Sequence, residues 1–414
     1  MFLNWVIIVE NTILHIDMNN FYASVETLYQ PELKNVPMAV AGDKENRHGI
    51  ILAKNMLAKN CGVKTAETIW QAQKKCPNLV FVKPHFDRYK KYSEFAKEIY
   101  YDYTDRIESF GLDECWLDVS GSEKLFGSGE QIAQTIRERV KSELGLTVSI
   151  GVSFNKIFAK LGSDYKKPDA VTVFDRSNFK EIVWKFSAEE LLYVGSSVKK
   201  ALNKYGIYTI GDIAKTDRVL MQKILGKAGG MLSVFARGED NTPVLQVDKQ
   251  EQVKTIGNST TLPRDITKDE DVKKVFMSLA EIVTGRVRKL GLKYSEVQIT
   301  VKYSNFEEYQ RQCTVESSSN DMATLYETAM KLYKMENRKN SIRLLGIRAG
   351  KFSDSEDKQI SFFVDERKKE GAERIEKVLD DVRSRYGSAI ITRALLCNEK
   401  DLLGDDGKDE KSFP

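Results

Sequence analysis

The sequence predicts an α+β fold in which strands and helices follow one another around a sheet with acidic residues at its strand ends. Short apolar runs with the two-residue alternation of strands are separated by segments with helical periodicity. Three carboxylates lie in two of these strand-like runs: Asp17 in TILHIDM (12–18), and the adjacent Asp113 and Glu114 in SFGLDECWLD (109–118). We expect the helices to lie on one face of the sheet.

The elements of the first part are predicted in order from Thr12. A strand there turns into a helix that reaches about Val25, and a helix at 54–62 ends at Gly62. A strand at 79–82 and an amphipathic helix through Tyr103 follow. A hairpin around Asp113, a helix at 131–145 and a strand at 146–152 complete this part.

The character of the sequence changes near Ser187. Short helical segments, many glycines and a basic excess over 199–227 predict a small helical domain, and the polar stretch at 247–256 predicts a linker. Beyond it, strands at 295–303 and 342–348 with two amphipathic helices predict a second α+β unit. From about Ser353 a polar segment, one charged helix (370–387) and a disordered acidic tail are expected.

Composition excludes several classes of protein. A chain of 414 residues with 41% hydrophobic content can bury sizeable cores, and its length suggests about two to four domains. We expect a soluble globular protein, and we expect it to act as a monomer. The five cysteines are scattered without CxxC spacing, which argues against a disulfide framework or a zinc site and favours the cytoplasm. The apolar start is interrupted by Glu10 before it is long enough for a membrane span. The net charge of +4 is a weak indication of a polyanionic partner.

The three acids indicate metal chemistry when they are taken together. A buried carboxylate without a partner is costly, so it needs a cation or strong hydrogen bonds. Oxygen ligands suit Mg²⁺, and two such ions can stabilise the attacking and leaving oxygens of phosphoryl transfer. Any one of these acids alone is more simply a strand-end or turn residue.

Three motifs carry a resemblance to a known family: IDMNNFYASVE (16–26), LDECWLD (112–118) and GVSFNKIFAKLGSDYKKPD (151–169). They resemble the Y-family translesion DNA polymerases, and among these the bacterial polymerase IV group. The resemblance implies a right-hand polymerase with a palm (1–26 and 77–185), small fingers (27–76), a helical thumb (186–246), a linker (247–253) and an α+β little finger (254–351). Residues 352–414 would hold a clamp-binding peptide, a helix and an acidic tail.

The resemblance also implies a catalytic site with two Mg²⁺ ions, for which Mn²⁺ can substitute. Asp17 and Asp113 would hold both ions, Glu114 the ion that activates the primer 3′-hydroxyl, and the backbone carbonyl of Met18 the nucleotide-bound ion. One ion would lower the pKa of the hydroxyl while the other neutralises charge on the pyrophosphate.

Four further residues match nucleotide contacts of the family: Phe21, Tyr22, Lys59 and Lys167. Tyr22 would be the steric gate against a ribose 2′-hydroxyl, although a core aromatic pair at a helix start is the commoner fate of Phe21 and Tyr22. The lysines would contact the triphosphate, with Lys59 in place of the usual Arg. Met56 and Ala53 also depart from the pattern, which predicts altered nucleotide binding.

DNA contacts are expected in two places. Residues 191–206 resemble a helix-hairpin-helix that binds phosphates through backbone amides, with Tyr193 in place of its first glycine. The expected contacts of this domain are Gly195, Ser197, Lys199 and Gly229, for which ordinary helix caps are the alternative. In the little finger they are Arg338, Arg343 and Arg348, for which a solvated charged face is the alternative.

The segment QISFF (359–363) resembles the peptide with which bacterial polymerases bind the sliding clamp. Its contact residues would be Gln359, Ile360, Phe362 and Phe363, because exposed aromatic residues in a polar segment indicate a partner. A plain edge strand is the alternative.

The expected function is therefore low-fidelity, template-directed DNA synthesis past damaged bases, with primer–template DNA, dNTP and a sliding clamp as partners. A non-catalytic DNA-binding homologue that recruits repair proteins is one alternative, but it predicts loss of the acids. Another palm-fold nucleotidyltransferase or cyclase is a second alternative, and it would not need a thumb or little finger.

Overall fold

The computed structural model describes residues 11–42, 49–247, 253–336, 340–354, 366–387 and 390–396. The chain divides into two compact units, one of residues 1–41 with 51–250 and one of residues 42–50 with 251–414. Several predictions lie outside the described residues: the first ten residues, most of the linker, Arg338, the peptide 359–363 and the acidic tail.

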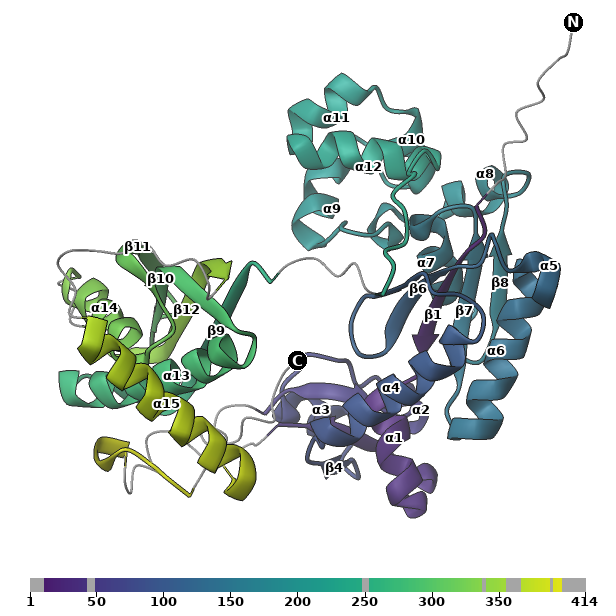
Figure 1. The fold of residues 1–414 in the computed structure, drawn as a ribbon. Coiled ribbons are helices and arrows are strands. Elements are labelled where there is room, and N and C mark those ends of the chain that lie inside the picture. The colour runs from purple at the N-terminus through teal and green to yellow at the C-terminus, as the bar shows by residue number, and fades with distance from the viewer. Residues whose placement is uncertain are drawn as a thin grey trace, which may run out of the picture. The chain divides into compact units, whose positions relative to one another are not determined.

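The first unit is built on a five-stranded sheet of order β5-β6-β1-β7-β8 (Figure 1). Central β1 pairs antiparallel with both β6 and β7, while β8 pairs parallel with β7. The expected hairpin around Asp113 is confirmed by β5 and β6. The strands are β1 (Ile13–Met18), β5 (Ile107–Ser109), β6 (Glu114–Asp118), β7 (Val148–Ser153) and β8 (Val171–Phe174).

Alternation along β1 divides its side chains between two faces. Leu14, Ile16 and Met18 belong to the core that includes residues of α4 (Phe86–Tyr101) and α6 (Gly129–Leu144). His15 and Asp17 point to the opposite face, where His15 contacts Ser163 of α7 (Lys156–Tyr165). The expectation that helices cover only one face of the sheet is therefore wrong.

Helix α7 reaches that second face because two glycines allow a close approach. A Cβ on Gly151 of β7 would lie 1.8 Å from the carbonyl oxygen of Ala159, and one on Gly162 would lie 2.9 Å from the Cα of Gly151. Helix and strand thus meet backbone to backbone, which brings the polar face of α7 over the end of β1.

A smaller sheet of order β3-β2-β4 accompanies α1, α2 and α3. Parallel pairing of β4 with β2 places Val80–Val82 in this sheet, beyond the predicted end of the fingers at residue 76. The elements are α1 (Phe21–Tyr29), the 3₁₀ helix η1 (Pro31–Asn35), β2 (Met38–Ala41), β3 (Ile51–Lys54), α2 (Met56–Asn60), α3 (Ile69–Lys75) and β4 (Val80–Val82).

After β8 the chain forms the short helices that the sequence predicts, within the first compact unit. Their core consists mainly of aliphatic and aromatic side chains between residues 154 and 236. The helices that follow β8 are α8 (Phe179–Ile182), α9 (Ser196–Asn203), α10 (Ile210–Lys215), α11 (Arg218–Leu225) and α12 (Lys227–Arg237), with the 3₁₀ turns η2 (Val183–Lys185) and η3 (Ala188–Glu190). A short helix, α5 (Glu123–Phe126), lies earlier in the chain, before α6.

The second unit is an antiparallel sheet of order β11-β10-β12-β9 with α13 and α14 packed on one face (Figure 1). It agrees with the predicted second α+β unit. Its elements are β9 (Thr255–Ile266), α13 (Asp269–Lys289), β10 (Leu292–Tyr303), β11 (Glu308–Ser319), α14 (Met322–Lys334) and β12 (Ile342–Asp354).

A last helix, α15 (Glu366–Tyr386), and the turn η4 (Ala394–Leu396) belong to the same unit. Arginine–carboxylate contacts join α15 to α13, for example Arg288 with Asp380 at 2.5 Å. Across the described ranges, none of the helices has the length and hydropathy that crossing a membrane would require.

Candidate active site

The three predicted acids meet where β1 and β6 lie side by side. Asp17, near the end of β1, is paired across the ladder with Glu114, the first residue of β6. Asp113 precedes Glu114, and its carbonyl accepts a hydrogen bond from the amide of Met18 at 3.0 Å. The strand pairing therefore brings together residues that are about 100 positions apart in the sequence.

Two lysines from the α7 region bind the acids. The ammonium of Lys160 lies 2.5 Å from Oε2 of Glu114, and that of Lys167 lies 2.6 Å from Oδ2 of Asp17. Lys167 also contacts Asp164 at 2.7 Å. Lys167 was predicted from the sequence, whereas Lys160 was missed, although its spacing of four from Lys156 indicates one helix face.

The acids influence one another electrically. Burial raises the pKa of Asp113, and the charge of Glu114 raises it further. Burial likewise raises the pKa of Asp17, and Lys167 opposes this effect. Burial also acts to raise the pKa of Glu114, but the interactions of its carboxylate with His15 and Lys160 outweigh this effect and lower the pKa to about 2. The site thus gathers negative charge that a cation would relieve.

Within the described ranges, no three His, Cys, Asp or Glu side chains are grouped closely enough to hold a metal ion as they stand. The chemistry of the donors nevertheless fits a hard divalent cation, because all three are carboxylates and two of them already bind a positive group. Each lysine contact uses one oxygen of its carboxylate, Oε2 of Glu114 or Oδ2 of Asp17.

Tyr22 is held by a second cluster that the sequence did not reveal. Its ring stacks on Tyr89 with centroids 4.2 Å apart and an interplanar angle of 8°. The hydroxyl of Tyr89 donates to buried Glu26 at 2.6 Å, and Arg88 and His85 contact the same carboxylate. Burial raises the pKa of Tyr22, and the charge of Asp113 adds to the effect.

The remaining nucleotide residues occupy different environments. Phe21 is 3% exposed and belongs to the core, which agrees with the alternative that it is a packing residue. Met18 ends β1 with its side chain in the same core. Lys59 lies in the last turn of α2, is exposed, and is close enough to Lys54 for its charge to lower the pKa of that residue, after burial.

The glycine positions of the predicted helix-hairpin-helix differ from one another in conformation and packing. Tyr193, in place of the first glycine, adopts φ +71°, a left-handed conformation that suits glycine better. Gly195 is the N-cap of α9, where no side chain caps the free amides, and Ser197 and Lys199 lie in its first turns. Gly229 differs, because it is buried against the carbonyl of Met221 and its amide donates to Gly226. A phosphate contact at Gly229 itself is therefore not supported.

Two of the three predicted basic residues of the second unit are described. Arg343 lies over the exposed ring of Phe306 at 5.0 Å, and Arg348 is exposed on β12, where it contacts Gln298. Alternation on β10 and β12 places Gln298 and Arg348 on the face opposite the helices. Arg338 lies outside the described residues.

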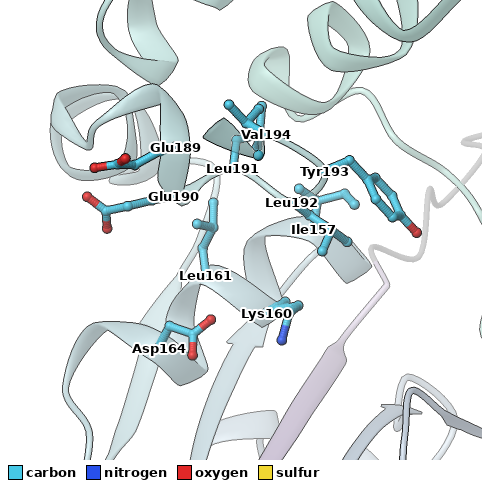
Figure 2. A pocket seen from close by; sticks show the side chains of 11 residues that line it. Ile157, Lys160, Leu161, Asp164, Glu189, Glu190, Leu191, Leu192, Tyr193 and Val194 are labelled. Carbon is cyan, nitrogen blue, oxygen red and sulfur yellow. The ribbon is translucent and has the colours of Figure 1, made fainter. Parts of the chain in front are cut away.

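A cavity of about 330 Å³ lies between α7 and the turn before α9. Its charged lining residues are Lys160, Asp164, Glu189 and Glu190, and Figure 2 shows Lys160 on the side of Asp164, with Glu189 and Glu190 apart from both. This acidic lining does not match the phosphates of a nucleotide, so we do not assign the triphosphate to this cavity.

Comparison with known proteins agrees with this fold. The solved structure described as "Y-family DNA polymerase chimera Dbh-Dpo4(243-245)-Dbh" aligns with a TM-score of 0.74 and 22% identity, over 83% of this chain and 99% of the other. The chain therefore has the fold of a Y-family DNA polymerase.

Family models give the relationship directly. Residues 16–164 match the impB/mucB/samB family and residues 253–362 match the C-terminal domain of that family. DNA polymerase IV of Acetivibrio thermocellus is 48% identical over 95% of this chain and 99% of its own length. DNA polymerase IV of Clostridium kluyveri is 38% identical over 91% and 96%. The chain belongs to the impB/mucB/samB family.

Proposed function

We propose that this protein is a DNA-directed DNA polymerase that adds deoxynucleotides to a primer 3′-hydroxyl at low fidelity and past damaged template bases. The family, the polymerase fold and the relatives named DNA polymerase IV support this function. The observation that carries it is the pairing of Asp17 with Glu114 beside Asp113, with cationic groups already bound to two of these acids.

Divalent metal is the implied cofactor, and two Mg²⁺ ions fit the proposal best. Bound there, they would acidify the primer hydroxyl and neutralise charge on the pyrophosphate. Asp17 and Asp113 would hold both ions, Glu114 the ion at the primer, and the carbonyl of Met18 the ion at the nucleotide. Strand pairing keeps these ligands on one rigid edge.

Lys167 and Lys59 would supply positive charge to the triphosphate of the nucleotide. Lys167 neutralises Asp17 in the structure, and with metal on Asp17 its ammonium would turn to the triphosphate. Lys59, exposed on α2, would contact the phosphates as a point charge. Because a lysine ammonium does not hold a carboxylate in a bidentate fork, Lys167 can leave Asp17 for the phosphates.

Tyr22 is the proposed steric gate. Its stack on Tyr89 and the Tyr89–Glu26 hydrogen bond fix the ring, and a fixed ring can exclude a 2′-hydroxyl by collision. Replacing Tyr22 with Ala should raise incorporation of ribonucleotides, and an unchanged ratio of ribonucleotide to deoxynucleotide use would contradict this role.

DNA would bind through both units. The free amides at the start of α9, with Ser197 and Lys199, suit a backbone phosphate, and Arg343 and Arg348 suit the duplex. Palm, fingers, thumb and little finger are proposed as the domains, with β4 added to the fingers. Action as a cytoplasmic monomer and clamp binding through 359–363 remain predictions.

Primer extension tests the function. Wild type and Asp113→Ala are compared with Mg²⁺ on intact and lesion-bearing templates. We expect extension on both templates by wild type and none above background by the variant, with equal binding of primer–template. DNA binding without extension by wild type would instead favour the non-catalytic homologue.

A further inference from the structure

His15 is a buried side chain that the proposed chemistry does not use. It is 0% exposed and lies on β1 two residues before Asp17, on the same face. Its Nδ1 lies 2.8 Å from Oγ of Ser163, and its Nε2 lies 3.4 Å from Oε2 of Glu114. Nε2 is buried and makes no hydrogen bond of good geometry, so Glu114 is the polar group that it faces.

The partners of the two ring nitrogens determine which one carries the hydrogen. The ring of His15 is fully buried, and a neutral imidazole carries a single N–H, on either Nδ1 or Nε2. Oγ of Ser163 can donate either to Nδ1 or to the carbonyl of Lys160, 2.8 Å away. In the second case Nδ1 must donate to Ser163, and the lone pair of Nε2 would face an anionic carboxylate.

The charge on Glu114 decides between these arrangements. A hydrogen bond to a charged group stabilises more than one between neutral groups. Ser163 therefore loses less by leaving a helix carbonyl than His15 would lose by presenting its lone pair to Glu114. Donation from Ser163 to Nδ1 and from Nε2 to Glu114 is the favoured arrangement.

We propose that His15 is a positioning residue for Glu114, which it holds through an N–H from Nε2 to Oε2, backed by the hydroxyl of Ser163. Lys160 binds the same oxygen, so both contacts leave Oε1 of Glu114 for a metal ion. Removing a residue that orients a metal ligand in this way typically weakens the binding of the metal. The inference rests on the proposed role of Glu114 as a metal ligand.

Packing alone does not explain the choice of residue. The ring of His15 meets Trp116 edge-on at 5.1 Å, a contact that a phenyl ring could also make. A buried polar ring costs free energy unless its nitrogens have partners. The nitrogens must therefore be tested separately from the ring.

Three substitutions make that separation. His15→Phe keeps a ring without nitrogens, His15→Gln can place an amide N–H near the position of Nε2, and His15→Asn reaches only towards Ser163. Mn²⁺ binding to the protein alone is titrated by electron paramagnetic resonance, and the Mg²⁺ concentration for half-maximal single-turnover extension is measured. The dissociation constant for Mn²⁺ should rise about tenfold in the Phe and Asn variants and stay within about twofold of wild type in Gln.

Extension at saturating Mg²⁺ should largely recover in all three variants. Equal metal dissociation constants in all variants and wild type would overturn the proposal. So would equal weakening in all three, in step with the melting temperature, because that pattern indicates packing.

Ser163→Ala provides a second route if the Phe variant does not fold. It leaves the imidazole and removes the hydroxyl behind it, so metal binding should weaken about threefold. An unchanged dissociation constant for Mn²⁺ in this folded variant would overturn the proposed role of Ser163 behind His15. Failure of wild type to extend primers would instead overturn the proposed function, whereas the Mn²⁺ titration tests His15 independently of catalysis.

Discussion

Two clusters of buried charge, one in each compact unit, are built from different cations. In the first unit Asp17 and Glu114 are bound by Lys167 and Lys160 through one oxygen each. In the second unit arginines bind carboxylates between α13, α15 and η4: Arg288, Arg383 and Arg393 with Glu281, Glu376 and Asp380.

The difference indicates which cluster has a structural role and which can exchange its cation. Arg288 binds both oxygens of Asp380, at 2.5 and 2.9 Å, because a guanidinium matches a carboxylate in a planar fork. A lysine ammonium is a point charge that leaves the other oxygen free. The arginine cluster therefore fixes α15 on α13, while the lysine cluster neutralises acids that can still accept a metal ion.

Replacing Asp17 with Asn is expected to have the largest effect of the four substitutions that test this difference, a loss of primer extension. Loss of a metal ligand removes several kcal/mol of transition-state stabilisation, so primer extension should fall by about a thousandfold or more. The melting temperature should not fall, because Lys167 keeps Asp164 as a partner. Asp102→Asn, an exposed acid of the same unit, is the control that should retain activity. A folded Asp17 variant with full activity would refute the site.

Replacing Arg288 with Met should act on stability. Glu376 and Asp380 would be left partly buried without this partner, which costs roughly 3–5 kcal/mol in the free energy of unfolding. Hydrogen exchange should show faster exchange of the amides of α15 and unchanged protection of β1. If α15 keeps its protection, the arginine cluster does not fix it.

Replacing Lys160 with Arg turns one cluster into the other. A guanidinium could cover both oxygens of Glu114, so the Mg²⁺ concentration for half-maximal extension should rise about fivefold. Lys156→Arg is the matched control, one helical turn away and paired with Glu108 at 2.5 Å. Equal Mg²⁺ requirements in the two variants would remove the distinction between the cations.

The smallest effect is expected for Arg311→Met. Arg311 pairs with Glu336 on the surface, where water screens the charges, so the urea midpoint of unfolding should not change measurably. A loss as large as that of Arg288→Met would show that burial is not what separates the two clusters.

Local pattern was enough to predict much of the fold. Alternation predicted β1 and β10, and the helix at 131–145 is confirmed as α6, which starts with a capping box at Ser128 and ends at Gly145. The left-handed Tyr193 lies at the position of a replaced glycine. These features depend on neighbours within a few residues.

Contacts distant in sequence were not predictable in the same way. The packing of α7 on the second face depends on Gly151 meeting Gly162, and the arginine contacts of α15 join residues about 100 positions apart. His15 was accessible in principle, because its spacing of two from Asp17 puts both on one strand face. The partner that gives it a role, Ser163, is 148 residues away.

Anomalous diffraction from crystals with Mn²⁺, primer–template and a non-hydrolysable dNTP tests the central claim most directly. We expect manganese peaks at the free oxygens of Asp17 and Glu114 and at Asp113, with Lys167 moved from Asp17 towards the triphosphate. Nucleotide bound in that complex with Lys167 still on Asp17, and no manganese at the three carboxylates, would contradict the account.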